Sequence, residues 1–473
     1  MIRTKIVATI GPSSNTRPKL EAMIDAGMNI ARLNFSHGTY EEHGEVINTI
    51  RSLSRTMNRP IGILLDLQGP KIRTGTLRGG RPVELKKGGT IRITTRKIEG
   101  TAEMVSTTYT HLPKDVKKGD RILIDDGLIE LMVLFKRKDT IKCKIISGGL
   151  LKEHKGINLP GVAVSAPSLT DKDRRDINFG IKVSVDYFAL SFVRKAEDLR
   201  QVKRFIRRQG HHTPVVAKIE KPEALDNMDA ILEEADAVMV ARGDLGVELN
   251  PEQVPCEQKK VIAAAVRANK PVITATQMLE SMCTNPIPTR AEASDVANAI
   301  FDGTDAVMLS GETASGRYPV QAVRMMAKIA AQSEGSKFMR FNLQHKKDPT
   351  DLVPQAVAQS AVNILQDLKA KGIVVFTFSG STAQLISQKR PSKPVYAFTP
   401  SLRVYNRLSL MWGITPLYIA NIDKTDRLIQ ASENILIDKR IARKNDIIII
   451  VIGFGLKKGS TNVIKIHRVG RAD

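Results

Sequence analysis

Two short segments place charged residues at the end of an apolar run: KIE at 218–220 and RGD at 242–244. Lys218 and Glu220 are two residues apart, so in a β-strand their side chains point to the same face. Glu220 and a neighbouring Asp244 would repel each other unless a cation lies between them, and carboxylate oxygens are ligands that Mg²⁺ and Mn²⁺ prefer. The pattern indicates a site for a divalent metal and an anion. From these residues alone, a Lys218–Glu220 salt bridge and an ordinary turn at 242–244 remain the alternatives.

Eight apolar runs of strand length recur along the chain and would position these residues. Each of the last five is followed by a segment with helical periodicity, so the chain repeats a strand–helix unit. Eight such units predict an α/β fold of the closed (β/α)8 type, a TIM barrel. The runs span residues 5–11, 28–36, 61–67, 186–193, 214–220, 237–244, 271–277 and 306–312.

The carboxyl ends of these strands carry many polar residues, and active sites of this fold lie at those ends. Alternation along the strand sends Lys218 and Glu220 toward the barrel axis and Ile219 outward against helices. Thr276 is either a catalytic hydroxyl or a cap at a strand end, and its position alone leaves both open. The following strand-end residues are expected to converge: Arg32, Asn34, Asp66, Lys218, Glu220, Arg242, Asp244, Thr276, Gln277, Ser310 and Glu312.

Changes in pattern divide the chain into three domains. Residues 1–69 and 166–345 form the barrel, and residues 70–165 read as a small all-β domain, an inserted β-barrel, because strand-like alternation and glycine turns replace the helical pattern. An insertion after a barrel strand emerges on the active-site side, where it can act as a lid. Residues 346–473 contain a helix at 351–370 and five further strands, which predict a C-terminal open α/β domain.

The composition is that of a globular protein, with 42% hydrophobic and 26% charged residues among 473. Three cysteines, odd in number and far apart, predict neither a disulfide framework nor a zinc site. The longest apolar run, at 447–453, is far shorter than the roughly 20 residues that span a bilayer. The start of the chain lacks the apolar core of a signal peptide, so a cytoplasmic protein without a membrane partner is expected.

The net charge of +23 is unusual, and a positive field attracts nucleic acids, anionic membranes and acidic small substrates alike. Aromatic residues make up only 4% of the chain, and the basic clusters at 203–212 and 438–444 contain no stacking residue except Phe205. Stacking on single-stranded nucleic acid is therefore not expected.

Seven segments resemble the signature sequences of the pyruvate kinase family, in order and at suitable spacing, and the resemblance covers essentially the whole chain. They are MNIARLNFSHG (28–38), LLDLQGPKIRTG (64–75), KGINLPG (155–161), AKIEKPEAL (217–225), MVARGDLGVE (239–248), TATQMLESM (274–282) and SGETASGRYP (310–319).

The resemblance implies the last step of glycolysis, in which a phosphoryl group passes from phosphoenolpyruvate to ADP and gives pyruvate and ATP. Lys218 would stabilise the transferring group and the enolate, Arg32 would hold the phosphate, and Glu220 and Asp244 would hold Mg²⁺ (or Mn²⁺). Arg242 would orient these carboxylates from behind. Substrate contacts are implied for Arg32, Lys218, Gly243, Asp244 and Thr276, and nucleotide contacts for Asn34, Ser36, His37, Arg73 and Lys155. Both substrates are polyanions, so the positive net charge of the chain would attract them.

The loop DLQGPKIR differs from that of family members that need potassium, which read much like DTKGPEIR. Those members hold the ion with groups that match Asn34, Ser36, Asp66 and the carbonyl of Leu67. Lys71 stands where they have Glu, and its ammonium can take the place of a bound cation. We therefore expect activity without potassium; the alternative is that Lys71 points to solvent and the ion binds regardless.

The segment TFSGSTA at 377–383 follows an apolar strand and opens a helix, where it either holds a phosphate or simply caps the helix. Similar enzymes bind phosphorylated activators in this domain and form homotetramers. Members activated by fructose bisphosphate tend to have basic residues where this chain has Phe378 and Ser381, so a sugar or nucleotide monophosphate is the expected activator. The expected effector residues are Thr377, Ser379, Ser381 and Thr382.

Two other functions remain open at this stage. A carbon–carbon lyase that acts on pyruvate in a metal-binding barrel would also need the residues of 218–220 and 242–244, but not the inserted domain or the nucleotide motifs. A nucleic-acid binder would use the basic surplus, and salt-dependent binding would reveal it.

Overall fold

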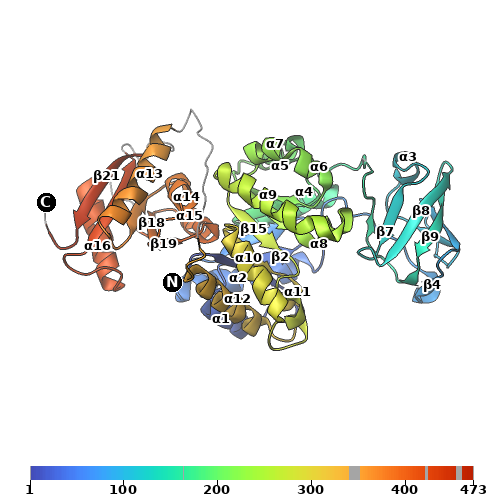
Figure 1. Ribbon diagram of the computed structural model, residues 1–473, viewed down its shortest axis with the longest axis horizontal. Helices are drawn as coiled ribbons and strands as arrows, with labels where there is room; N and C mark the ends of the chain where they lie inside the picture. The colour runs from blue at the N-terminus through green and yellow to red at the C-terminus, as the bar shows by residue number, and fades with distance from the viewer. Residues whose placement is uncertain (1, 163, 340–351, 421–423, 454–460, 472–473) are drawn as a thin grey trace.

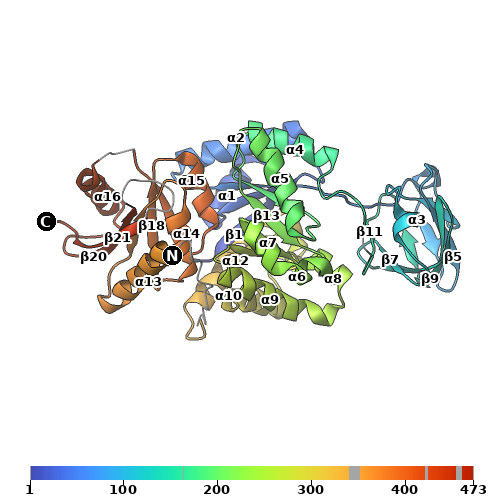
Figure 2. The same ribbon diagram turned by 90° about the horizontal axis from the view of Figure 1, so that it is seen from above.

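The computed structural model describes residues 2–162, 164–339, 352–420, 424–453 and 461–471. Three domains lie in a row, with the barrel in the centre, the inserted domain at one end and the C-terminal domain at the other (Figures 1 and 2). The inserted and C-terminal domains therefore contact opposite ends of the barrel. The expected boundary at 345/346 lies outside the described residues.

The barrel is closed, and all eight expected strands form it. The strands run parallel in the order β1-β16-β15-β14-β13-β12-β3-β2. Their residues are almost all buried, since helices cover the outer face and side chains fill the interior, and this is why these runs are apolar throughout. The bounds are β1 Lys5–Ile10, β2 Ile30–Asn34, β3 Gly62–Asp66, β12 Tyr187–Leu190, β13 Val215–Ile219, β14 Ala237–Ala241, β15 Val272–Ala275 and β16 Ala306–Leu309.

The helices around the barrel begin at recognisable sequence signals. Thr39 with Glu42, Thr170 with Asp173, and Thr289 with Glu292 form capping boxes that satisfy the first free backbone amides. Residues 242–244 are not a turn, because they open a helix directly after β14. The helices are α1 Arg17–Ala26, α2 Tyr40–Thr56, α4 Asp171–Lys182, α5 Ala196–Arg208, α6 Pro222–Asp226, α7 Met228–Glu234, α8 Arg242–Glu248, α9 Val254–Arg267, α10 Arg290–Phe301, α11 Gly311–Ala314 and α12 Pro319–Glu334, with short 3₁₀ turns η2 Pro251–Gln253 and η3 Glu280–Cys283.

Strand alternation separates the outer core of the barrel from its interior, as expected. In β13, Val215, Ala217 and Ile219 pack outward against the helices, whereas Val216 belongs to the cluster inside the barrel. Lys218 follows Val216 on the inner face. The interior cluster also contains Leu410 of the C-terminal domain, which therefore closes the amino-terminal end of the barrel. The carboxyl-terminal end is left for the polar residues.

The inserted domain has a core of its own and a mixed β-sheet. Among the described residues its strands pair as one six-stranded sheet, β11-β7-β8-β9-β5-β6, and one two-stranded sheet, β10-β4, not as the closed barrel we expected. The elements are η1 Arg78–Gly80, β4 Val83–Leu85, β5 Thr90–Thr94, β6 Met104–Ser106, α3 Leu112–Asp115, β7 Arg121–Ile124, β8 Ile129–Lys136, β9 Thr140–Ser147, β10 Gly149–Leu151 and β11 Ile157–Asn158.

The C-terminal domain is the expected open α/β sheet, in the order β19-β18-β17-β20-β21 with only β21 antiparallel. Separate apolar clusters cover its two faces. In the described part of the chain, no helix is long and apolar enough to cross a membrane. The elements are α13 Leu352–Asp367, β17 Ile373–Phe376, α14 Ser381–Gln388, β18 Val395–Thr399, α15 Leu402–Arg407, η5 Leu408–Leu410, β19 Ile414–Tyr418, α16 Thr425–Asp438, β20 Ile447–Gly453 and β21 Thr461–Arg468.

Candidate active site

Lys218 lies at the centre of a polar layer at the carboxyl end of the barrel. Its Nζ atom is 2.7 Å from Glu220 Oε1 and 3.3 Å from Asp66 Oδ1, and it donates a 2.8 Å hydrogen bond to Ser191 Oγ. Burial opposes the charge of Lys218, but the carboxylates of Asp66, Glu220 and Asp244 outweigh it and raise the pKa of the amine. Lys218 is therefore a fixed ammonium group and not a base.

Arg32 and Asp66 form the adjoining part of this layer, from β2 and β3. Arg32 Nη2 lies 2.7 Å from Asp66 Oδ2, and its Nη1 donates a 2.9 Å hydrogen bond to Thr9 Oγ1. Burial would raise the pKa of Asp66, but the charges of Lys218 and Arg32 hold it below its usual value. Asp66 therefore stays ionised and sets the position of both cations.

Glu220 and Asp244 fit a divalent metal. Burial raises the pKa of Glu220, and the negative charge of Asp244 adds to this, although Lys218 opposes both. Glu220 Oε2 accepts a 2.8 Å hydrogen bond from the amide of Phe192, and the buried Oε1 forms the ion pair with Lys218. Within the described ranges, no three His, Cys, Asp or Glu side chains gather to hold a metal. A metal here would use these two carboxylates together with substrate or water oxygens, which suits Mg²⁺.

Gly243 and Thr276 meet beside Asp244. The amide of Gly243 donates a 2.7 Å hydrogen bond to Thr276 Oγ1, and this hydroxyl donates to the carbonyl of Ala275 at 2.5 Å. Thr276 and Gln277 both have left-handed backbone angles, with φ of 69° and 53°. Thr276 is thus held in a strained turn at the end of β15, which is typical of functional loops.

The prediction that Arg242 orients the carboxylates of Glu220 and Asp244 is wrong, because Arg242 contacts neither of them. Its buried guanidinium donates to the carbonyls of Ala275, Thr276 and Gln277, and its Nη1 lies 2.6 Å from Asp295 Oδ2. A guanidinium offers five donors in a rigid fork, which matches a cluster of carbonyls. Arg242 therefore supports the loop that carries Thr276.

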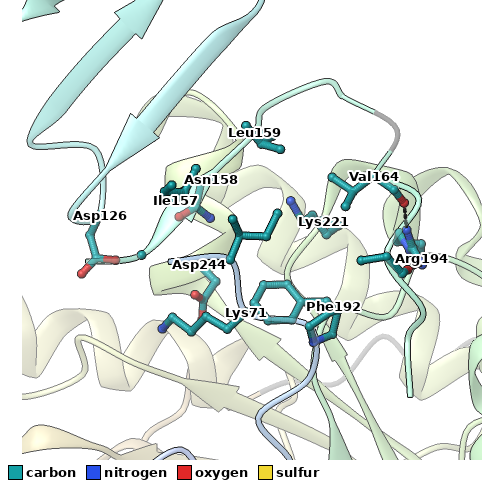
Figure 3. A pocket seen from close by; sticks show the side chains of 14 residues that line it. Lys71, Asp126, Ile157, Asn158, Leu159, Val164, Phe192, Arg194, Lys221 and Asp244 are labelled. Carbon is teal, nitrogen blue, oxygen red and sulfur yellow. Dashed lines mark hydrogen bonds between the residues drawn. The ribbon is translucent and has the colours of Figure 1, made fainter. Parts of the chain in front are cut away.

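A cleft between the barrel and the inserted domain opens beside Asp244 (Figure 3). Lys221 and Asp244 come from the barrel, and Lys71, Asp126 and Asn158 come from the inserted domain. Glu248 of α8 connects the two sides, because its Oε1 lies 2.5 Å from Lys221 Nζ and accepts a 3.1 Å hydrogen bond from Asn158 Nδ2.

The expected nucleotide residues fall into two groups. His37 and Arg73 are close enough to interact, since the pKa of His37 is lowered first by burial and then by the charges of Arg73, Lys71 and Arg32. Lys155, by contrast, is paired within the inserted domain, with its Nζ 2.8 Å from Asp125 Oδ1. Asn34 Oδ1 accepts a 3.1 Å hydrogen bond from the amide of Ser36.

The groups expected at a potassium site already have protein partners. Asp66 is paired with Arg32 and Lys218, and the carbonyl of Leu67 accepts a 2.7 Å hydrogen bond from Ser191. Lys71 lines the cleft, and its ammonium has no ion pair or hydrogen bond with any described residue.

Some of the polar groups in the loop 377–382 form hydrogen bonds within the protein. Thr377 Oγ1 accepts a 2.9 Å hydrogen bond from the amide of Gly380, and the buried Thr382 Oγ1 lies 2.5 Å from Thr461 Oγ1. Ser379 and Ser381 face each other at 2.9 Å between their hydroxyl oxygens; Ser379 is exposed and Ser381 is half-buried. Only these two hydroxyls are accessible to a ligand.

Sequence reasoning missed several residues that contact the site. Ser191 and Phe192 lie within the run DYFALSFV, directly after β12, and Thr9 lies in KIVATIG. The alternation that placed Lys218 would also have placed Ser191 inward, because it is two residues beyond Ala189 of the interior cluster. No local signal pointed to Glu248, since its partners lie in different domains.

Comparisons with known proteins agree with this geometry. The family model of the pyruvate kinase barrel domain matches residues 1–323, and that of the pyruvate kinase alpha/beta domain matches residues 355–467. The chain is 46% identical to a pyruvate kinase of Staphylococcus epidermidis over 475 aligned positions, which cover 99% of this chain and 81% of the relative. A pyruvate kinase of Staphylococcus aureus is equally similar.

Among solved structures, a crystal structure of a pyruvate kinase from Cryptosporidium parvum superposes with a TM-score of 0.92 and is 40% identical. The match covers 99% of this chain and 96% of that one. Family models, full-length relatives and fold all agree, and we conclude that this chain belongs to the pyruvate kinase family.

Proposed function

We propose that the polar layer around Lys218 carries out the reaction of this pyruvate kinase, in which phosphoenolpyruvate and ADP give pyruvate and ATP. The bond from phosphorus to the enol oxygen breaks, a bond from phosphorus to the terminal oxygen of ADP forms, and the enolate takes up a proton at its methylene carbon. The main task of a protein in such a transfer is to position the groups and offset their charge.

The position of the buried Lys218, with its Nζ atom 3.3 Å from Asp66 Oδ1 and 2.7 Å from Glu220 Oε1, is the observation that carries this proposal. A permanent ammonium at the barrel mouth can stabilise the transferring phosphoryl group and the enolate oxygen, both of which carry developing negative charge. Arg32 would hold the phosphate, and Asp66 would keep both cations in place through its contacts with each. Lys218, Arg32 and Thr276 are the proposed catalytic residues.

Glu220 and Asp244 would hold a divalent cation, Mg²⁺ or Mn²⁺, which when bound offsets the charge of the substrate phosphate. The burial of Glu220 and the repulsion between its carboxylate and that of Asp244 support this role, because a cation between them would relieve both. Gly243 and Thr276 would contact the substrate beside Asp244, and Arg242 would hold Thr276 in position from behind.

The inserted domain would bring part of the nucleotide site. His37 and Arg73 are the best supported contacts, because burial and then the nearby charge of Arg73 lower the pKa of His37. Asn34 and Ser36 would lie beside them, and Lys155 would have to exchange its Asp125 partner for a phosphate.

Potassium would not be required, since Lys71 supplies a charge where other members bind the ion. The ammonium of Lys71 has no partner in the described part of the chain and contributes to the positive potential at His37. The potassium ligands Asn34, Ser36, Asp66 and Leu67 would then serve only to shape the site.

Regulation would come from a phosphorylated metabolite at the loop 377–382 of the C-terminal domain. The hydroxyls of Ser379 and Ser381 would meet its phosphate, and Thr377 and Thr382 would hold the loop in shape. The family resemblance supports a cytoplasmic homotetramer.

Pyruvate formation from phosphoenolpyruvate, measured with and without ADP and Mg²⁺, tests the proposal. We expect pyruvate and ATP in equal amounts only when both are present. Pyruvate without ATP would point to a different reaction at this site, in which water takes the phosphoryl group and free phosphate is released.

A further inference from the structure

A second cavity lies on the far side of the barrel from the active site, between the barrel and the C-terminal domain. Its volume is about 470 Å³, within the roughly 300–1,000 Å³ of typical small-molecule sites. The end of α2 and the segment before β12 form one wall, and α15 with the end of β19 forms the other. The cavity is thus built by two domains at their contact.

The charge of this cavity is unbalanced. Arg51, Arg55 and Arg403 line it, and Asp186 is its only lining carboxylate. Asp186 does not neutralise Arg55 or Arg403, because its Oδ2 lies 2.8 Å from Arg51 Nη2 and accepts a 2.7 Å hydrogen bond from the amide of Ile63.

Arg55 and Arg403 supply the free charge. Neither guanidinium has an ion pair or a hydrogen bond with any residue that the structure describes, and the two come from different domains. Guanidinium groups match phosphate in geometry and bind it through paired hydrogen bonds. Two of them without partners suit a dianion, and a phosphate monoester carries about −1.5 to −2 charges at pH 7.

The remaining lining suits an organic ring. Leu402 and Tyr418 are 63% and 49% exposed, which is high for side chains of this size at a domain junction. Tyr405 adds a second aromatic ring, and Asn58 and Asn406 add amide groups. A ligand ring would cover this apolar surface and find hydrogen-bond partners beside it.

We propose that this cavity binds a small phosphate monoester with a sugar or nucleoside ring, held by Arg55 and Arg403 between the two domains. The site is separate from the loop 377–382, whose residues do not line the cavity. A ligand that contacts both domains favours the domain placement in which both sets of contacts form.

The strands next to the cavity lead to the active site. Asp186 directly precedes β12 and binds the start of β3, and at their other ends these strands carry Ser191 and Asp66, both contacts of Lys218. Binding in the cavity is therefore expected to shift the phosphoenolpyruvate saturation curve, and phosphoenolpyruvate to shift the binding of the ligand by the same factor. This coupling, unlike the binding itself, rests on the proposed role of Lys218.

Isothermal titration of the full-length protein tests the binding. The probes are ribose 5-phosphate, AMP and inorganic phosphate, at fixed ionic strength and with EDTA to remove divalent metal from the active site. A Ser381→Asp background keeps phosphate away from the loop 377–382. We expect ribose 5-phosphate or AMP to bind once per chain and at least tenfold more tightly than inorganic phosphate.

In the Ser381→Asp background, a further Arg403→Ala or Arg55→Ala substitution should weaken that binding at least tenfold. Each substitution removes an exposed charge that has no partner among the described residues, and neither changes a core side chain. Arg443→Ala, which removes an exposed arginine of the same domain outside the cavity, is the matched control and should leave the affinity unchanged. Melting temperatures confirm that each variant is folded.

Three results would overturn the site: no binding of either monoester, binding no tighter than that of inorganic phosphate, or equal losses in Arg403→Ala and Arg443→Ala. Binding that leaves the phosphoenolpyruvate curve of the wild type unmoved would keep the site and overturn its coupling to catalysis.

Discussion

Arg242 Nη2 donates a 2.6 Å hydrogen bond to the carbonyl oxygen of Thr276. The arginine of the RGD segment thereby holds the loop of the next strand, and the aspartate two residues on, Asp244, is a proposed metal ligand. The segment thus links two parts of the candidate active site, since Arg242 and Thr276 lie 34 residues apart in the chain.

Arg242→Lys should lower kcat/KM at least tenfold, a cost of about 1.4 kcal/mol in transition-state stabilisation. Thr276 and Gln277 have left-handed backbone angles that cost on the order of 1–3 kcal/mol each, and the single nitrogen of a lysine lacks the planar fork that reaches three carbonyls and Asp295. Steady-state kinetics check the loss. Asp295→Asn is the matched control, because it leaves the guanidinium on the carbonyls and should keep most activity. Near-normal activity of Arg242→Lys would show that residues 275–277 keep their conformation without the guanidinium.

Lys71→Glu should make the enzyme respond to potassium, whereas the wild type should be nearly fully active without it. The change restores the acidic residue of potassium-dependent members and removes a charge that would repel the ion by about 4 kcal/mol at 4 Å in a medium of effective dielectric 20. Activity is measured with potassium chloride against a bulky organic cation at constant ionic strength. Strong stimulation of the wild type by potassium would rule out the replacement.

Ser381→Asp should abolish activation by phosphorylated metabolites. Ser381 carries one of the two accessible hydroxyls in the loop 377–382, and a carboxylate there repels a phosphate. The measurement is the phosphoenolpyruvate saturation curve with a panel of sugar and nucleotide monophosphates. If no compound shifts the curve of the wild type, the loop is only a helix cap.

Lys5→Met should change how stability depends on pH. Burial at the junction with the C-terminal domain, where Nζ donates a 2.7 Å hydrogen bond to the carbonyl of Ile414, lowers the pKa of Lys5 from 10.5 to about 8, and the charge of Glu334 only partly opposes this. Between these pH values the unfolded chain keeps a proton that the folded chain has lost. The unfolding free energy of the wild type therefore gains up to about 3 kcal/mol from Lys5 as pH rises through this window, and Lys5→Met lacks the gain.

Denaturant unfolding of both proteins between pH 7 and 10.5 checks this, with the exposed Lys444→Met as control. A stability difference between wild type and Lys5→Met that does not vary with pH would mean that Lys5 titrates normally.

The fold could be predicted because its signals are local. Each barrel strand is a short apolar run, and the alternation of residues 215–220 alone fixed which side chains face the axis. The boundaries of the capped helices follow from pairs such as Thr39 and Glu42.

Contacts between distant segments could not be predicted in the same way. The sequence interpretation placed Arg242 beside two carboxylates, but its guanidinium donates instead to the carbonyls of residues 275–277. Leu410 in the barrel interior and the cavity between Arg55 and Arg403 both depend on how two domains pack, which no local pattern encodes. The pairing of the strands in the inserted domain is a long-range property for the same reason.

The kcat of Lys218→Met tests the central claim most directly. Methionine has a similar length but no charge, so the variant loses only the ammonium that is proposed to stabilise the transferring phosphoryl group and the enolate. Circular dichroism and melting temperature verify the fold, since removal of Lys218 leaves Asp66 and Glu220 with one cation fewer. We predict that a folded Lys218→Met has almost no turnover. A folded variant that keeps more than about a tenth of the wild-type kcat, a loss below about 1.4 kcal/mol, would contradict the role assigned to Lys218.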